Sequence, residues 1–321
     1  MASNKFSVGV DLGGTSIKFG LVSQDGKIQK KMVLPTFADK GPAAVTKQIK
    51  KGVTALLKNN SKKIQGIGIG APGTVKLKKG TVEYPPNFPN WGRVHLGKNL
   101  EKLLKKNVYV ENDANAAAIG ELIFGIGKKT DSFIMVTLGT GVGGGIVFER
   151  KLFRGETGGA GEIGHVTIDI NGKHCNCGSY GCVEAYIGNN YMISDAEKLL
   201  ADHKESGIQK ILNDDMELLT PKVIYDAANA GDEFSINFIK QLGTKLGYGL
   251  VSAINILDIA TVVVGGGVAG FDEFLFIPLE AAIKERVLKP LKNRIKVKHS
   301  KLKNEAGIKG AAALVFYSQF N

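Results

Sequence analysis

The feature that most constrains this chain is an internal repeat of a strand, a glycine turn and a second strand. Residues 8–18 read VGVDLGGTSIK, and residues 134–144, which lie 126 positions later, read IMVTLGTGVGG. Both copies have a Leu-Gly pair at the turn and alternating apolar residues on each side. Alternation with a period of two around a glycine turn predicts a β-hairpin in each place. Two copies of one hairpin, one in each half of the chain, predict a duplicated architecture of two domains.

The rest of the chain alternates between strand and helix patterns. Its 321 residues exceed the length of about 250–300 at which single cores stop growing, which also favours two domains. The predicted strands lie in residues 6–22, 26–34, 62–70, 108–111, 133–148, 259–264 and 294–299. The predicted helices lie in residues 42–59, 96–104, 114–125, 220–257 with a break near Ala230-Gly231, 271–286 and 310–319. This order of elements predicts the α/β class.

Composition excludes several classes of protein. The sequence holds 42 glycines, about twice the usual share, and three cysteines that all lie within residues 175–182. A long apolar run and a signal-peptide core are absent from the sequence, so we expect no membrane span and no secretory signal. Three clustered cysteines cannot cross-link a chain of this length, so we expect a reducing, cytoplasmic location rather than a secreted disulfide protein. The net charge is +12, but the lysines are scattered and lack interleaved aromatic residues. This pattern indicates a solvated lysine-rich surface rather than a nucleic-acid interface.

The glycine turns predict phosphate binding, because backbone N–H groups without side-chain obstruction can approach phosphate oxygens. The first turn carries Asp11, Thr15 and Lys18, and the second carries Thr140. A third glycine cluster, at 262–270, follows a predicted strand and precedes a predicted helix. The dinucleotide pattern G-x-G-x-x-G occurs at 68–73, 139–144 and 265–270. The second occurrence precedes a predicted strand instead of a helix, and the third lacks the acidic residue expected about 20 residues later. Dinucleotide binding is therefore disfavoured.

An acidic junction follows the predicted strand at 108–111. Asp113 begins the next predicted helix, where it could simply cap the helix N-terminus. Alternatively, it is a carboxylate at the carboxyl end of a strand, where α/β proteins bind ligands, and it could accept a proton from a substrate hydroxyl. The neighbouring phosphate turns favour the catalytic interpretation.

The three cysteines have the spacing of metal ligands. Cys175, Cys177 and Cys182, together with one histidine, would make a closed tetrahedral zinc site of the structural type. His165 is preferred over His174, because a ligand ten residues upstream allows the loop to fold back, whereas His174 adjoins the first cysteine. Free buried thiols and a disulfide are the alternatives.

These motifs together resemble the ROK family of sugar kinases. The matching segments are DLGGTSIK at 11–18, ENDANAAAIGE at 111–121, GTGVGGG at 139–145, GGAGEIGH at 158–165, CNCGSYGCVE at 175–184 and VGGGVA at 264–269. The resemblance implies a two-domain actin/hexokinase-like (ribonuclease H-like) fold with an interdomain cleft. It implies a small α/β domain at 1–112, completed by a C-terminal helix at 308–321. A large α/β domain at 113–307 would carry the zinc loop.

The resemblance also implies an ATP-dependent hexokinase that phosphorylates the 6-hydroxyl of glucose with Asp113 as catalytic base. The implied sugar-binding residues are Gly73, Asn87, Asn112, Asp113, Glu162, His165 and Glu184. The implied ATP-binding residues are Asp11, Gly13, Gly14, Thr15, Lys18, Thr140 and Gly141 at the phosphates and Gly266 and Gly267 at the adenosine. Mg²⁺ would accompany ATP, and structural Zn²⁺ would be held by His165, Cys175, Cys177 and Cys182.

Other activities within the family stay open. The acceptor could be another hexose or an N-acetylhexosamine such as N-acetylmannosamine, and polyphosphate could replace ATP as donor. A sugar-responsive repressor is disfavoured, because the first glycine turn begins near residue 8 and leaves no room before it for a helix-turn-helix domain. We expect the partners to be a small-molecule sugar and ATP, with no nucleic acid or membrane, in a homodimer or homotetramer.

Overall fold

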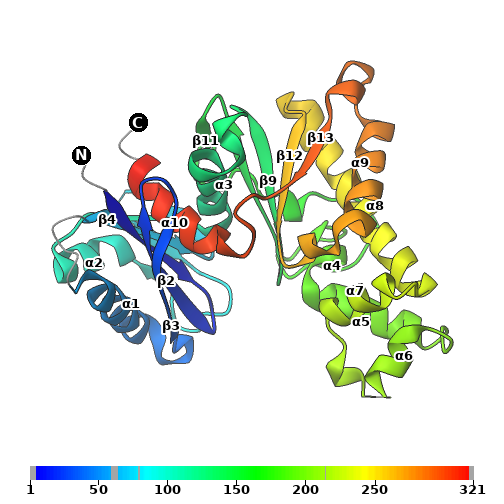
Figure 1. Cartoon of the computed structure of the whole chain (residues 1–321), viewed down its shortest axis with the longest axis horizontal. Helices are drawn as coiled ribbons and strands as arrows, with labels where there is room; N and C mark the ends of the chain where they lie inside the picture. Colours follow the sequence, from blue (N-terminus) through cyan, green and yellow to red (C-terminus); the bar gives the residue numbers. More distant parts are fainter. Residues whose placement is uncertain (1–4, 59–63, 79, 214, 318–321) are drawn as a thin grey trace. The chain divides into compact units, whose positions relative to one another are not determined.

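The computed structural model describes residues 5–58, 64–78, 80–213 and 215–317. Contacts group the chain into two compact units, and Figure 1 shows their helices and strands. Unit 1 comprises Met1–Met135, Gly145–Gly161 and Ser300–Asn321, and unit 2 comprises Val136–Gly144 and Glu162–His299. The predicted α/β class is confirmed. The predicted domain boundary at residue 112 stays a prediction, although contacts group the helix that follows it with unit 1.

The main sheet of unit 1 contains the first predicted hairpin. Its strand order is β3 (Ile28–Pro35), β2 (Ser16–Ser23), β1 (Phe6–Leu12), β4 (Ile64–Ala71) and β8 (Val108–Asn112). The first three strands form an antiparallel meander, whereas β1, β4 and β8 run parallel. The carboxyl ends of these three strands therefore lie at one edge of the sheet.

Different helices cover the two faces of this sheet. On one face, α1 (Gly41–Leu57) and α2 (Leu96–Leu104) share a core with alternate strand residues such as Val10 and Phe19. On the other face lies α10 (Ala306–Tyr317), drawn in red in Figure 1, which also packs on α3 (Asp113–Phe124). Unit 1 also contains a small antiparallel sheet of β5 (Thr74–Lys76), β6 (Thr81–Glu83) and β7 (Arg93–Val94).

Glycines leave the sheet face under α10 without side chains at the points of contact. A Cβ on Gly9 would lie 2.1 Å from the carbonyl oxygen of Ile308, and a Cβ on Gly68 would lie 1.8 Å from that of Ala311. Both distances are far below a van der Waals contact, so α10 can pack on the sheet backbone only where side chains are missing. Part of the glycine excess therefore serves helix packing rather than phosphate binding.

The second predicted hairpin forms β9 and β10 of another five-stranded sheet. Its order is β11 (Lys151–Phe153), β10 (Val142–Phe148), β9 (Phe133–Leu138), β12 (Thr261–Gly266) and β13 (Lys296–His299). The outer pairs differ in direction, because β10 and β11 are antiparallel whereas β12 and β13 are parallel. In both five-stranded sheets, the two strands of the repeated hairpin are the second and third strands in the strand order.

Helices make up most of unit 2. They are α4 (Glu184–Ile187), α5 (Asn189–Leu200), α6 (Gly207–Leu212), α7 (Pro221–Asn229), α8 (Glu233–Leu257) and α9 (Asp272–Arg286). Sequence patterns predicted α7 to α9, including the break near Ala230, but assigned no element to α5 and α6. The described 3-10 helices of both units are Ala38–Lys40, Ile126–Lys128, Ile163–His165, Met216–Leu218, Val268–Phe271, Lys289–Arg294 and Lys303–Glu305. Among the described residues, no helix combines the length and apolar character needed to cross a membrane.

Candidate functional site

Predicted site residues gather at the carboxyl edge of the unit 1 sheet. The strand register pairs Asp11 with Gly70 and Gly70 with Glu111. This register brings the first glycine turn and the Asn112-Asp113 junction to the same edge of the sheet. In open α/β sheets, ligands bind outside the carboxyl ends of parallel strands.

The junction between β8 and α3 presents Asp113 to solvent. Asn112 is the N-cap of α3, because its Oδ1 accepts hydrogen bonds from the backbone N–H groups of Ala114 and Asn115 at 3.0 and 3.1 Å. Asp113 is the first helical residue and is exposed, and its Oδ1 accepts from the same Ala114 N–H at 2.8 Å. The alternative in which Asp113 serves only as the N-cap is therefore wrong, since Asn112 occupies that position.

The amide of Asn112 is also engaged through its nitrogen. Its Nδ2 donates to the carbonyl oxygen of Gly73 at 3.1 Å, which ties the predicted sugar-binding loop to the junction. Gly73 has a φ of 81°, and a Cβ on it would lie 2.8 Å from Cα of Pro85. Asn87 lies two residues after Pro85, and its Cβ would lie 3.4 Å from a Cβ on Gly14 of the first glycine turn. Unit 1 thus brings these predicted residues close to one another.

The first glycine turn is a tight connection held by backbone hydrogen bonds. The N–H of Gly13 donates to the carbonyl oxygen of Ser16 at 3.1 Å, and Thr15 is exposed. Behind the turn, the Asp11 carboxylate lies 3.9 Å from the Lys18 ammonium. Burial raises the pKa of Asp11, and the positive charge of Lys18 lowers it in part. A partly buried carboxylate of this kind fits a divalent cation, which would offset the cost of desolvating its charge.

The second glycine turn, in unit 2, is organised around Glu184. The Oε2 atom of Glu184 accepts a hydrogen bond from the backbone N–H of Val142 at 2.8 Å. A Cβ on Gly141 would lie 2.3 Å from that same oxygen, so a larger residue here would displace the Glu184 carboxylate. Thr140 is exposed at the tip of the turn.

The third glycine cluster lies beside the second turn. Gly266 has a φ of 91°, and a Cβ there would lie 2.1 Å from the carbonyl oxygen of Leu138, the last residue before the turn. Gly266 and Gly267 are both exposed. Unit 2 therefore assembles two glycine-rich surfaces and Glu184 in one place.

The predicted zinc ligands lie together as a candidate metal centre. The ligand atoms of His165, Cys175, Cys177 and Cys182 all lie within 4.8 Å of one another. The Sγ atoms of Cys177 and Cys182 are 3.7 Å apart, and Sγ of Cys175 is 3.8 Å from Nδ1 of His165. Tetrahedral coordination with Zn–S bonds of about 2.3 Å gives sulfur–sulfur separations of about 3.8 Å. The donor set and its spacing therefore fit Zn²⁺, and the disulfide alternative is wrong because all three thiols are free.

The three thiols differ in their surroundings. Burial raises the pKa of Cys182 to about 12 and also raises the pKa of Cys175, whereas a backbone hydrogen bond from Ser179 lowers the pKa of the exposed Cys177. A divalent cation favours the thiolate form, so metal binding here would release protons. The other ring nitrogen of His165 faces Glu162 at 4.0 Å, and Glu162 is exposed.

Two buried carboxylates of unit 1, at the start and in the last turn of the ENDANAAAIGE motif, were not predicted as site residues from sequence. Glu111 is 3% exposed and pairs with Arg154 at 2.9 Å between Oε2 and Nε. Glu121, at the other end of α3, is fully buried and accepts from Ser300 Oγ at 2.6 Å and from the N–H of Leu302 at 2.9 Å. Both lie in the ENDANAAAIGE motif, but their partners are too distant in sequence for a local pattern to predict.

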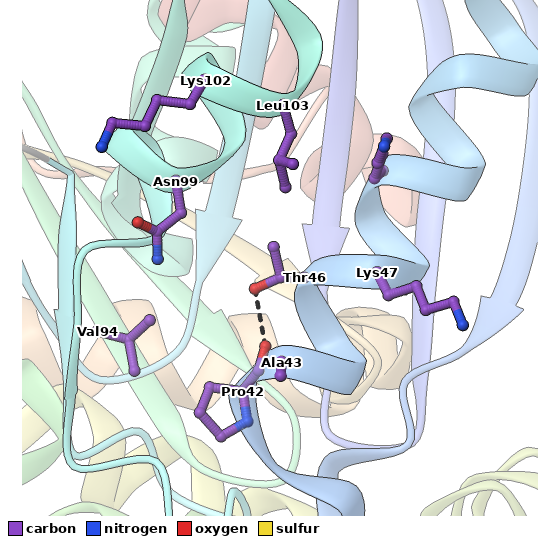
Figure 2. A pocket seen from close by; sticks show the side chains of 9 residues that line it. Pro42, Ala43, Thr46, Lys47, Val94, Asn99, Lys102 and Leu103 are labelled. Carbon is purple, nitrogen blue, oxygen red and sulfur yellow. Dashed lines mark hydrogen bonds between the residues drawn. The ribbon is translucent and has the colours of Figure 1, made fainter.

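A hollow of about 680 Å³ lies between α1 and α2, and no predicted site residue lines it (Figure 2). It is lined by Pro42, Ala43, Thr46, Lys47, Lys50, Val94, Asn99, Lys102 and Leu103. Inside it, Thr46 Oγ1 donates to the carbonyl oxygen of Pro42 at 2.7 Å. Figure 2 shows the Lys47 and Lys102 side chains pointing to opposite sides, so their ammonium groups do not converge on one anion.

Comparison with known proteins identifies the family. The model of the ROK family matches residues 7–317. The chain belongs to the ROK family. Its fold is accordingly the actin/hexokinase-like fold of ROK kinases, as predicted.

Relatives within the ROK family include enzymes and regulators. A glucokinase of Thermotoga maritima is 36% identical over 308 residues, which cover 96% of each chain. The crystal structure of a ROK family glucokinase from Streptomyces griseus in complex with glucose and AMPPNP matches with a TM-score of 0.83 and 32% identity, covering 96% of this chain and 98% of that one. A xylose repressor of Caldicellulosiruptor bescii is 34% identical over 254 residues, which are 79% of this chain and 63% of the repressor.

Proposed function

We propose that this protein is an ATP-dependent hexokinase that transfers a phosphoryl group to the 6-hydroxyl of glucose. The observation that carries the proposal is the exposed Asp113 carboxylate at the carboxyl edge of the unit 1 sheet. The strand register brings Asp11 and the first glycine turn to the same edge. Near full-length similarity to glucokinases, and to a ROK structure that binds glucose and an ATP analogue, supports the same conclusion.

Asp113 is the proposed general base. Phosphoryl transfer depends mostly on positioning and charge neutralisation, and a carboxylate close to the acceptor hydroxyl takes its proton as the bond to phosphorus forms. The capping hydrogen bonds of Asn112 fix the backbone from which Asp113 projects. Both polar groups of the Asn112 side chain are engaged with the protein, so its contribution to sugar binding would be largely through this placement.

The glycine turns are the proposed phosphate-binding elements. Backbone N–H groups at Gly13, Gly14 and Gly141 and the hydroxyl groups of Thr15 and Thr140 would bind phosphate oxygens, and Lys18 would add a positive charge. Asp11 would hold Mg²⁺, which when bound neutralises the charge on the transferring phosphate. The open surface at Gly266 and Gly267 would take the adenosine.

The zinc loop and Glu184 are the proposed sugar-binding elements, together with Asn87 and the Gly73 loop. Zn²⁺, held by His165 and the three cysteines, would have a structural role, closing the loop that carries Glu162 and His165. Glu184 lies two residues after Cys182 in sequence, so the same loop would also place its carboxylate. Fixed polar partners give sugar specificity, because each unpaired buried polar group costs about 1–3 kcal/mol.

A sugar panel tests this function. The purified chain is assayed with MgATP and, in turn, glucose, mannose, fructose and N-acetylmannosamine, and sugar phosphate formation is measured. We expect the highest kcat/KM with glucose and formation of glucose 6-phosphate. Negligible turnover of glucose beside efficient turnover of N-acetylmannosamine would overturn the choice of acceptor, and replacement of ATP by polyphosphate tests the donor.

An assembly of two or four copies and a cytoplasmic location are further expectations of this proposal. Size-exclusion chromatography with light scattering measures the first, and localisation of the tagged chain in cells measures the second. A monomer that is fully active would contradict the expected assembly.

A further inference from the structure

The ion pair of Glu111 and Arg154 lies within unit 1, directly behind the Asn112-Asp113 junction. The Glu111 side chain is only 4% exposed, and the Arg154 side chain is 26% exposed, with 2.9 Å between Nε and Oε2. Removing one partner of a pair this buried leaves an uncompensated charge, which is strongly unfavourable. The pair therefore constrains the backbone on both sides, at the Asn112-Asp113 junction and at the start of the segment after Arg154.

On one side, the pair holds the junction that presents Asp113. The second oxygen of Glu111, Oε1, accepts from the backbone N–H of Asn112 at 3.0 Å and from Nδ2 of Asn115 at 3.4 Å. Glu111 thus contacts the capping residue of α3 and the first turn of the helix at the same time. With Arg154 on its other oxygen, the Glu111 carboxylate has one well-defined orientation.

On the other side, the pair holds the start of the segment 155–161, which leads along the chain to Glu162 and His165. This segment closes on itself, because the N–H of Ala160 donates to the carbonyl oxygen of Arg154 at 3.1 Å. It is also fastened to β5, where Lys76 Nζ donates to the carbonyl oxygen of Thr157 at 2.7 Å. Arg154 immediately precedes this segment, and its side chain reaches Glu111 behind the Asn112-Asp113 junction.

We propose that Arg154 is a positioning residue for phosphoryl transfer. By neutralising Glu111, the Arg154 guanidinium fixes the backbone that presents Asp113. It also links this backbone to the start of segment 155–161, which leads along the chain to the proposed sugar-binding residues. The inference rests on the proposed kinase function. Its consequence is that loss of the pair lowers kcat through misplacement of Asp113, since displacements of about 1 Å can cost about 100-fold in rate.

Substitutions on both partners test the proposal in the full-length, metal-loaded protein. Arg154→Met should lower kcat at least about tenfold while KM for MgATP stays within about twofold, with zinc content unchanged. Arg154→Lys should recover most of the lost kcat, because the contact is a single Nε–Oε2 bond that an ammonium can replace. Glu111→Gln should resemble Arg154→Met, and the double substitution should cost far less than the product of the two single effects.

Arg150 provides the matched control. It lies at the other end of β11 and pairs with Asp131 at 2.8 Å, but its side chain is 52% exposed. Arg150→Met should leave kcat near the native value. If Arg154→Met and Glu111→Gln are as active as Arg150→Met, or if they only lower thermal stability with native kcat, the positioning role is wrong. If the native chain itself phosphorylates no sugar, the proposed function fails instead, which separates the two outcomes.

Discussion

The Glu184 carboxylate accepts a hydrogen bond from the backbone N–H of Val142 at 2.8 Å, which joins the segment after the metal loop to the second glycine turn. Glu184 begins α4, immediately after the segment that contains Cys182. A residue proposed to bind sugar is therefore fixed by a turn proposed to bind phosphate. Because a Cβ at position 141 would approach this carboxylate to 2.3 Å, the relationship predicts that substitutions in the turn affect sugar binding.

Gly141→Ala tests this relationship. The added methyl group would lie 2.3 Å from Glu184 Oε2 and must displace the carboxylate, so we expect KM for sugar to rise about tenfold or more. Steady-state kinetics with each substrate varied in turn measure this change. Gly139→Ala is the control, because a Cβ at Gly139 meets nothing within 4 Å and KM for sugar should stay near native. Equal effects of the two substitutions on KM for sugar would contradict the account.

The metal centre is tested by elemental analysis of the purified chain. We expect about one zinc per chain, lost in Cys177→Ser and in His165→Ala. His174→Ala is the matched control, since His174 pairs with Tyr180 outside the ligand cluster and zinc should be retained. Retention of zinc in Cys177→Ser together with its loss in His174→Ala would refute the assigned ligands.

Gly68→Ala tests how α10 packs on the sheet. The new Cβ would lie 1.8 Å from the carbonyl oxygen of Ala311, so the helix must move away, and we expect a loss of about 3 kcal/mol or more in the free energy of unfolding. Urea denaturation measures it. Gly270→Ala has open space around its Cβ and should change stability by less than about 0.5 kcal/mol. A native-like Gly68→Ala protein would show that the close approach is not required.

Asp232 is expected to contribute acid-sensitive stability at the N-cap of α8. Burial acts to raise the pKa of Asp232, but hydrogen bonds from Ser235, Gly207 and Ser206 outweigh it and bring the pKa below its usual 3.8. Because the folded-state pKa is depressed, this stability is present above pH 3.8 and is lost as the pH falls through the folded-state value. Asp232→Ala should therefore cost about 1–2 kcal/mol near pH 7, and the difference should shrink below about pH 4.

The surface residue Asp226 provides the comparison for Asp232. It pairs with Lys222 one helical turn away, and its side chain is 47% exposed. Asp226→Ala should cost less than about 0.5 kcal/mol, as exposed pairs usually do. Urea unfolding at several pH values measures both variants, and a pH-independent loss in Asp232→Ala would show that the charge of the cap is irrelevant.

Local signals in the sequence were enough to predict many elements. Thr220 followed by proline predicted the start of a helix, and the Thr220 hydroxyl does accept a hydrogen bond from the N–H of Val223 at 3.3 Å. The break before α8 was predicted from Ala230-Gly231, and Gly231 has a φ of 88°. The choice of His165 over His174 came from spacing alone, and His165 is the histidine that lies with the cysteines. In each case the cause of the structure lies within a few residues.

Long-range packing could not be predicted in the same way. The role of Gly68 depends on Ala311, which lies at the other end of the chain, and the partner of Glu111 is Arg154. The sequence also left open whether Asp113 was the N-cap, because Asn112 and Asp113 are both good capping residues and only the backbone decides between them. These contacts set the geometry of the candidate site, which is why the motif indicated the chemistry but not the residues that support it.

The central claim is that Asp113 is the base of a sugar kinase, and the rate of sugar phosphate formation by Asp113→Asn tests it most directly. The variant keeps the size and the helix position of the side chain, so it should still bind glucose in calorimetric titration. We expect kcat with glucose and MgATP to fall about 10²- to 10⁴-fold. A variant that folds, binds glucose and retains native kcat would contradict the account.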